Sequence, residues 1–309
     1  MAEVHCRERR YKEALSCYSE AQRIREAFHG TYFHEEIANT LNLSGNVLAR
    51  QGEFDLAMDK HKEALRILKE CCGENVQEDV AETLNSLGML SCRAGMYLEA
   101  IDYYDRALGI QMKLGCDDHP YVAETLHCIG CAQARKGDLP GALQSLEECY
   151  NMRLQFLGMD HPQQATTLHE IAKVQLKRGR LKKAIHIIDA ALNIRVESLS
   201  EHHIDVALAM TTKASCLVAR GNFADANKLF IEALPIAKSA VGDLHPSVAW
   251  IQVQIGVMHL RKCDLEEAAD TVNEAIAIYK HSNLDEDHPG IKEATVELEK
   301  IERAEMLCV

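Results

Sequence analysis

The sequence predicts an all-α protein, a solenoid of about seven helical hairpins followed by a single C-terminal capping helix. The first observation behind this prediction is a regular series of small residues: Gly45, Gly88, Gly130, Ala172, Ala214 and Gly256. The steps between them are 43, 42, 42, 42 and 42 residues. The second observation is that only 6 prolines and 5% aromatic residues occur in 309 positions, which favours helices over β-sandwiches. Because one hairpin cannot bury its apolar face alone, the repeats are expected to stack into one domain spanning residues 1–309.

Alanines repeat in step with the small residues and mark the second helix of each hairpin. Twelve positions on are Ala57, Ala100, Ala142, Ala184, Ala226 and Ala268, and seven further are Ala64, Ala107, Cys149, Ala191, Ala233 and Ala275. Small residues at fixed helical positions let two helices approach closely. An earlier copy, Ala14 and Ala21, predicts a first hairpin whose own first helix is truncated.

Glycines and prolines punctuate the repeat between these helices. Seven positions after each of the first five small residues stand Gly52, Gly95, Gly137, Gly179 and Gly221. Each is predicted to end a helix in the left-handed backbone region, and Cys263, at the sixth such place, should be slightly strained. Asp-His-Pro occurs at 118–120, 160–162 and 287–289, with Leu244-His245-Pro246 as a near match. Proline suits the first helical position, so the histidines before it are interpreted as capping and packing residues rather than catalytic ones.

Two further features concern the last helices of the chain. Residues 289–307 are predicted to form the capping helix, because they are rich in Glu and Lys. Pro235 lies inside the second helix of the sixth hairpin and is expected to kink that helix or to end it early.

The repeat resembles the tetratricopeptide repeat (TPR) over nearly the whole chain. The 42-residue period, Asp-His-Pro and the segments Val80-Ala81-Glu82-Thr83-Leu84 and Val122-Ala123-Glu124-Thr125-Leu126 are similar to the kinesin-light-chain type. This resemblance implies a right-handed superhelix and a non-catalytic adaptor that binds peptide segments in its concave groove. It makes a kinesin-type motor or its cargo proteins candidate partners. The sequence departs from that type in having no heptad segment for motor binding, and in carrying groove asparagines only in two repeats.

The candidate groove residues lie three before, one after and five after each central small residue. Peptide-binding candidates are Asn42, Asn46, Arg50, Asn85, Arg93, His127, Arg135, His169, Lys173 and Lys177. Asparagine can hydrogen-bond an extended backbone and arginine can pair with carboxylates, so we expect an acidic or polar peptide. The alternative is that the cations merely occupy the last turn of each first helix, where the helix dipole favours them whatever the function.

Composition and the remaining motifs exclude several other classes. With 34 basic and 47 acidic residues, the net charge of −13 argues against nucleic-acid binding, and the basic run at 176–183 is interpreted as a solvated turn. No apolar run is long enough for a membrane span, and no signal peptide is recognised. We therefore expect a cytoplasmic protein whose 12 cysteines are thiols.

Catalytic and metal signatures are also missing from the sequence. It contains no phosphate-binding loop and no G-x-S-x-G, so neither an enzyme nor a cofactor is predicted. Cys128 and Cys131 form a C-x-x-C without a second pair, and a metal held by His127, Cys131 and His169 is a minor alternative. A different class of function stays open, namely a regulatory or sensor array belonging to a larger multidomain enzyme such as a nucleotide-dependent switch protein. The sequence predicts no oligomeric state.

Overall fold

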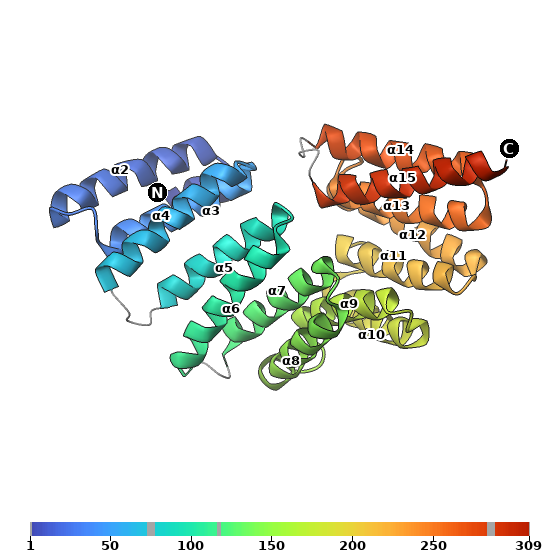
Figure 1. The fold of residues 1–309 in the computed structure, drawn as a ribbon, viewed down its shortest axis with the longest axis horizontal. Helices are drawn as coiled ribbons and strands as arrows, with labels where there is room; N and C mark the ends of the chain where they lie inside the picture. Colours follow the sequence, from blue (N-terminus) through green and yellow to red (C-terminus); the bar gives the residue numbers. More distant parts are fainter. Residues whose placement is uncertain (1, 73–77, 116–118, 283–287, 309) are drawn as a thin grey trace. The chain divides into compact units, whose positions relative to one another are not determined.

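The computed structural model describes residues 2–72, 78–115, 119–282 and 288–308, and within them every regular element is a helix (Figure 1). In chain order the helices are α1 (Ala2–Arg7), α2 (Tyr11–His29), α3 (Glu35–Gln51), α4 (Phe54–Cys72), α5 (Glu78–Arg93), α6 (Tyr97–Lys113), α7 (Pro120–Lys136), α8 (Leu139–Leu157), α9 (Pro162–Lys177), α10 (Leu181–Leu199), α11 (Ile204–Ala219), α12 (Phe223–Val241), α13 (Pro246–Lys262), α14 (Leu265–His281) and α15 (Pro289–Cys308). The all-α fold class and the repeated hairpins are confirmed. None of the described helices is both long and apolar enough to cross a lipid bilayer.

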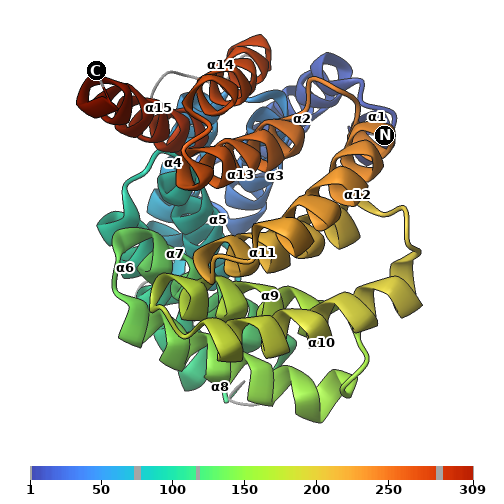
Figure 2. The same cartoon turned by 90° about the vertical axis from the view of Figure 1, so that its right-hand side faces the viewer.

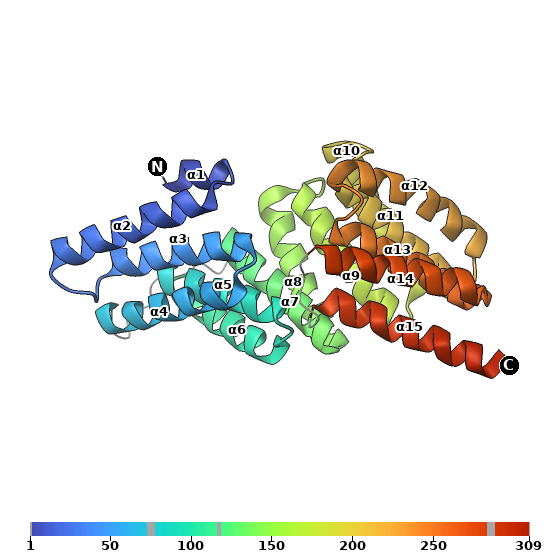
Figure 3. The same cartoon turned by 90° about the horizontal axis from the view of Figure 1, so that it is seen from above.

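The chain divides into two compact units, which we call unit 1 (Met1–Lys136) and unit 2 (Gly137–Val309). In unit 1, α1 packs on α2, and the hairpins α3–α4 and α5–α6 follow, with α7 against α6 (Figure 3). In unit 2, α8 packs on α9, and the hairpins α9–α10, α11–α12 and α13–α14 stack in chain order (Figure 2). The last helix, α15, covers α14 and α13, as expected of a cap. A single solenoid domain over residues 1–309 stays a prediction.

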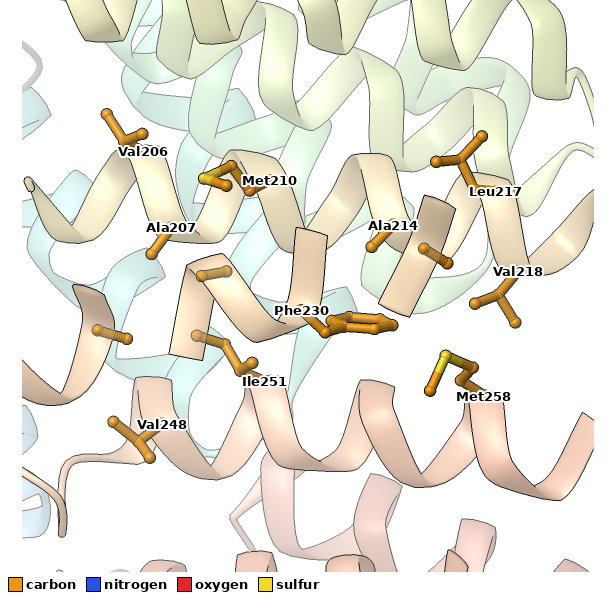
Figure 4. Close-up of a cluster of buried hydrophobic side chains, with 13 residues drawn as sticks. Val206, Ala207, Met210, Ala214, Leu217, Val218, Phe230, Val248, Ile251 and Met258 are labelled. Atoms are coloured by element: carbon orange, nitrogen blue, oxygen red, sulfur yellow. The ribbon is translucent and has the colours of Figure 1, made fainter. Parts of the chain in front are cut away.

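The small residues of the repeat lie where the two helices of a hairpin touch. A Cβ atom built on Gly45 would come within 2.7 Å of His61, and one on Gly256 within 2.5 Å of Val272. Phe230 of α12 lies in the largest apolar cluster of unit 2 (Figure 4). Its ring lies between α11 and α13 and is 1% exposed. The close approach predicted from the small residues is therefore confirmed.

The turns also follow the sequence pattern. The five expected glycines adopt φ between 71° and 98°. At the sixth turn Cys263 takes φ 64° and ψ 24°, so a residue with a Cβ atom occupies the left-handed region. L-residues pay a steric penalty there, as predicted.

Histidines cap the first helix of most hairpins. Nδ1 of each accepts a hydrogen bond from the backbone N–H two residues later, over 3.1 to 3.3 Å, in His34, His119, His161, His203, His245 and His288. The predicted capping role is confirmed, while Asp118 and Asp287 of the same motifs lie outside the described residues. His34 was not anticipated, and neither His34 nor His203 is followed by proline.

Pro235 was expected to kink its helix or to end it early; the early end is wrong, and the kink stays a prediction. Helix α12 continues through Pro235 to Val241. Proline removes only the hydrogen bond to the carbonyl of Ile231. Both residues are exposed, Ile231 by 64%, so water can bond this carbonyl and the helix survives.

Candidate functional site

The candidate groove residues fall on four helices in the two units. Unit 1 carries Asn42, Asn46 and Arg50 on α3, Asn85 and Arg93 on α5, and His127 and Arg135 on α7; unit 2 carries His169, Lys173 and Lys177 on α9. In unit 1, α3 contacts α5 and α5 contacts α7, so the first seven residues lie on three neighbouring helices.

The asparagines of unit 1 link one repeat to the next. Nδ2 of Asn42 donates to Oγ1 of Thr83 at 2.7 Å, and Nδ2 of Asn85 donates to Oγ1 of Thr125 at 3.0 Å. Oδ1 of Asn42 also lies 3.0 Å from Nδ1 of His61. These amides therefore hold neighbouring helices in register. The threonines that accept these hydrogen bonds belong to a series that repeats with the same period and that the repeat pattern above did not include. The members of this series are Thr40, Thr83, Thr125 and Thr167.

Three arginines of unit 1 form an exposed row at the ends of its first helices. Arg50, Arg93 and Arg135 stand in the last turns of α3, α5 and α7. No carboxylate among the described residues forms an ion pair with any of the three. The guanidinium of Arg93 lies 5.2 Å from the ring centre of Phe54, which orients it. We call these three residues the arginine row.

Arg135 lies close to the helix that carries Arg93. Burial raises the pKa of the Cys92 thiol, and the positive charge of Arg135 opposes that rise. Cys92 directly precedes Arg93 on α5. Arg93 and Arg135 thus stand on the neighbouring helices α5 and α7.

The cysteines of the C-x-x-C motif serve different contacts. Cys128 hydrogen-bonds with Tyr104 of α6, whereas Sγ of Cys131 lies 3.6 Å from Nε2 of His127. The cysteines whose side chains are described carry thiols rather than disulfides.

His169 of unit 2 is a buried junction between three helices. Its Nε2 lies 2.7 Å from Oγ1 of Thr212, and Nη1 of Arg195 donates to its Nδ1 at 2.7 Å. Burial, and then the charge of Arg195, lower the pKa of His169 to about 3. Both ring nitrogens are occupied, which leaves none for a metal.

The remaining candidates of unit 2 differ in exposure. Lys173 is half-buried and its Nζ is 3.0 Å from both carboxylate oxygens of Glu170, while Lys177 is exposed in the last turn of α9. Further along, Thr211 and Val253 occupy the groove positions but are 0% and 1% exposed. Those two side chains pack between helices and offer no surface to a ligand.

One group of side chains in the described part of the chain has the composition of a metal site. Ligand atoms of His29, His34 and Glu36 lie within 4.8 Å of one another. The two imidazole rings stack at 3.5 Å with 12° between their planes, and Nδ1 of His34 already caps α3. Stacked parallel rings direct their nitrogens side by side rather than towards one ion. We therefore interpret these three side chains as part of the N-terminal cap of α3 rather than as a metal site.

Comparison with known proteins connects this arrangement to a family. A family model described as tetratricopeptide repeat matches residues 1–70, 79–155, 135–197, 163–239 and 205–281. No curated protein sequence matches the chain significantly.

Three solved structures illustrate the similarity of fold. The apo form of RapI shares 15% identity, covers 90% of this chain and 95% of its own, and has a TM-score of 0.69. A putative kinesin light chain from Podosopora anserina with nearly identical TPR-like repeats shares 19% identity, with coverage of 68% and 99% and a TM-score of 0.51. The Rap conjugation gene regulator of the plasmid pLS20, in complex with the Phr* peptide, shares 16% identity, with coverage of 90% and 77% and a TM-score of 0.58.

Proposed function

The chain belongs to the tetratricopeptide repeat family, and we propose that it is a non-catalytic scaffold that binds acidic or polar protein segments along the arginine row of unit 1. The observation that carries this proposal is the row itself. Three exposed arginines end three neighbouring helices in a protein of net charge −13, and none of them forms an ion pair with a carboxylate of the described residues. Guanidinium forks bind carboxylates in bidentate geometry, which gives direction as well as affinity.

The spacing of the row defines the ligand further. Neighbouring packed helices lie about 8–10 Å apart, and a polyproline II chain advances about 3.1 Å per residue with three residues per turn. Carboxylates three residues apart in such a peptide share one face and match the spacing of Arg50, Arg93 and Arg135. The amides that order this surface, Asn42 and Asn85, keep the three helices in register.

The related structures support this proposal at the level of a scaffold. One helical-repeat relative is in complex with a peptide, and another is a putative kinesin light chain. Cargo segments or a kinesin-type motor are therefore candidate partners. The cytoplasm suits the thiols of the chain. His127 of unit 1 is a further candidate for this surface. Lys173 and Lys177 of unit 2 are candidates for a separate surface, on which His169 is buried.

The proposal is tested by fluorescence polarisation with two labelled peptides. One has glutamate at every third position and the other has glutamine at the same positions. We expect only the acidic peptide to bind, with an affinity that falls as salt rises. Arg93→Glu with Arg135→Glu should weaken binding by about tenfold or more, because contacts of ~1 kcal/mol become repulsive. The matched control is Lys182→Glu with Lys183→Glu in unit 2, which makes the same charge change elsewhere. Equal losses in both double variants would contradict a specific site.

A further inference from the structure

A hollow of about 350 Å³ lies in unit 1, away from the arginine row. Its walls come from the second half of α4, the first half of α5 and the second half of α6. Val80 and Leu84 of α5 line it, whereas Arg93 of the arginine row ends the same helix. Thirteen residues of helix separate Val80 from Arg93, about 20 Å along the axis. The hollow is therefore a separate surface.

The floor of the hollow is apolar. Leu84 is 1% exposed, and Val80 and Ile110 are half-buried against the same cluster of core side chains. The partly exposed Val80 and Ile110 therefore offer a contact surface for one apolar side chain of a partner, the form that anchor residues take in protein interfaces.

Gly109 keeps one wall of the hollow open. It lies inside α6 and is exposed, and a Cβ atom built on it would meet no atom within 4 Å. Glycine is a poor helix former, and no neighbour of Gly109 requires the absence of a side chain. The lack of a side chain at Gly109 leaves open space beside the apolar floor of the hollow.

Cations surround the hollow. Lys69 and Lys113 are exposed and form no ion pair with a carboxylate in the described part of the chain. Arg106 is 3.3 Å from the carboxylate of Asp102 and lies over the ring of Tyr103. Two lysines that form no ion pair within the described ranges, beside an apolar floor, complement an apolar side chain with acidic neighbours.

We propose that this hollow docks a partner protein through one apolar anchor residue flanked by acidic residues. The arginine row recognises charge along an extended segment, whereas this surface selects a single anchor. The two sites therefore give the scaffold two independent attachments in unit 1.

The test uses three labelled peptides. The first has phenylalanine between two pairs of glutamates, the second has serine in place of phenylalanine, and the third has glutamines in place of the glutamates. We expect the first to bind at least about tenfold more tightly than either of the others, since both anchor and charge contribute.

Variants locate the binding. Gly109→Leu fills the hollow without changing charge and improves helix propensity, so a loss of binding of about tenfold or more will not reflect unfolding. The matched control is Ala277→Leu, an exposed residue four repeats later at the same position of α14, which should bind as the original protein does. Lys69→Glu with Lys113→Glu should also abolish binding, while Lys182→Glu with Lys183→Glu should not.

Other outcomes overturn the proposal in distinct ways. Equal binding of the phenylalanine and serine peptides, or unchanged binding by Gly109→Leu, would exclude an anchor in this hollow. Loss only in Arg93→Glu with Arg135→Glu would assign the peptide to the arginine row, which leaves the proposed function intact and removes this site. Binding of dodecanoate that depends on Gly109, without peptide binding, would replace a protein segment with a fatty acid.

Discussion

Gly88 and Tyr104 are in such close contact that a Cβ atom on Gly88 would lie 2.6 Å from Cε1 of the tyrosine. Tyr104 is 3% exposed, and its hydroxyl hydrogen-bonds with the thiols of Cys92 and Cys128. The ring is therefore held in place by contacts on several sides. The glycine, rather than a movable side chain, sets the separation of α5 and α6.

Gly88→Ala should destabilise the protein by about 1–3 kcal/mol, because an inserted methyl group overpacks a fixed contact. The measurement is urea unfolding followed by circular dichroism. Gly109→Ala is the control within α6, where open space surrounds the new methyl group, and it should raise stability by about 1 kcal/mol. A Gly88→Ala protein as stable as the original would show that Tyr104 can move.

His245→Ala should reduce stability by about 1 kcal/mol, because the backbone N–H of Ser247 loses its acceptor at 3.1 Å. His245→Asn should restore most of the loss, since asparagine is a good N-cap residue. The change is measured as a shift of the urea midpoint. His186 is exposed within α10, and its replacement by alanine should change stability by less than about 0.5 kcal/mol. An equal effect of both substitutions would mean that the cap contributes nothing.

Cys263→Gly should stabilise the turn between α13 and α14 by about 1 kcal/mol, since glycine adopts φ 64° without the steric penalty of a Cβ atom. Cys263→Ala retains the Cβ atom and should leave stability nearly unchanged. Thermal unfolding monitored by circular dichroism distinguishes them. A gain in the alanine variant would attribute the effect to the thiol instead of the backbone.

The repeat pattern predicts those structural features that depend only on residues close together in the sequence. Gly52 and His161 sit at helix ends fixed by spacing, so their backbone and capping roles follow from the sequence. The orientation of the Asn42 side chain does not follow from the sequence. Its partner Thr83 is 41 positions away, and the contact depends on how two repeats stack. His169 is similar: its occupied nitrogens depend on Arg195, 26 residues on. Spacing indicated candidate groove positions but could not distinguish a side chain that contacts the next repeat from one that is exposed.

The stability of the protein should fall as pH decreases from about 6.5 to about 4, with His61 as one source. Burial lowers the pKa of His61 from 6.5 to about 4. Between these values the unfolded chain binds a proton that the folded protein does not, so stability rises with pH across this window and is lost as pH falls. Protonation is unfavourable because Nδ1 already bonds to Asn42, while Nε2 is buried against Gly45 without an acceptor among the described residues.

The loss attributable to His61 is up to about 3 kcal/mol, from roughly 1.4 kcal/mol per pKa unit. Urea unfolding at several pH values between 7.5 and 4.5 measures it, and His61→Leu should flatten the curve, because leucine occupies the equivalent place at Leu146. The fully buried His169 acts in the same direction, so some pH dependence should remain. The exposed His186→Leu should leave the slope unchanged. Parallel curves for the original protein and His61→Leu would assign the acid sensitivity to other groups.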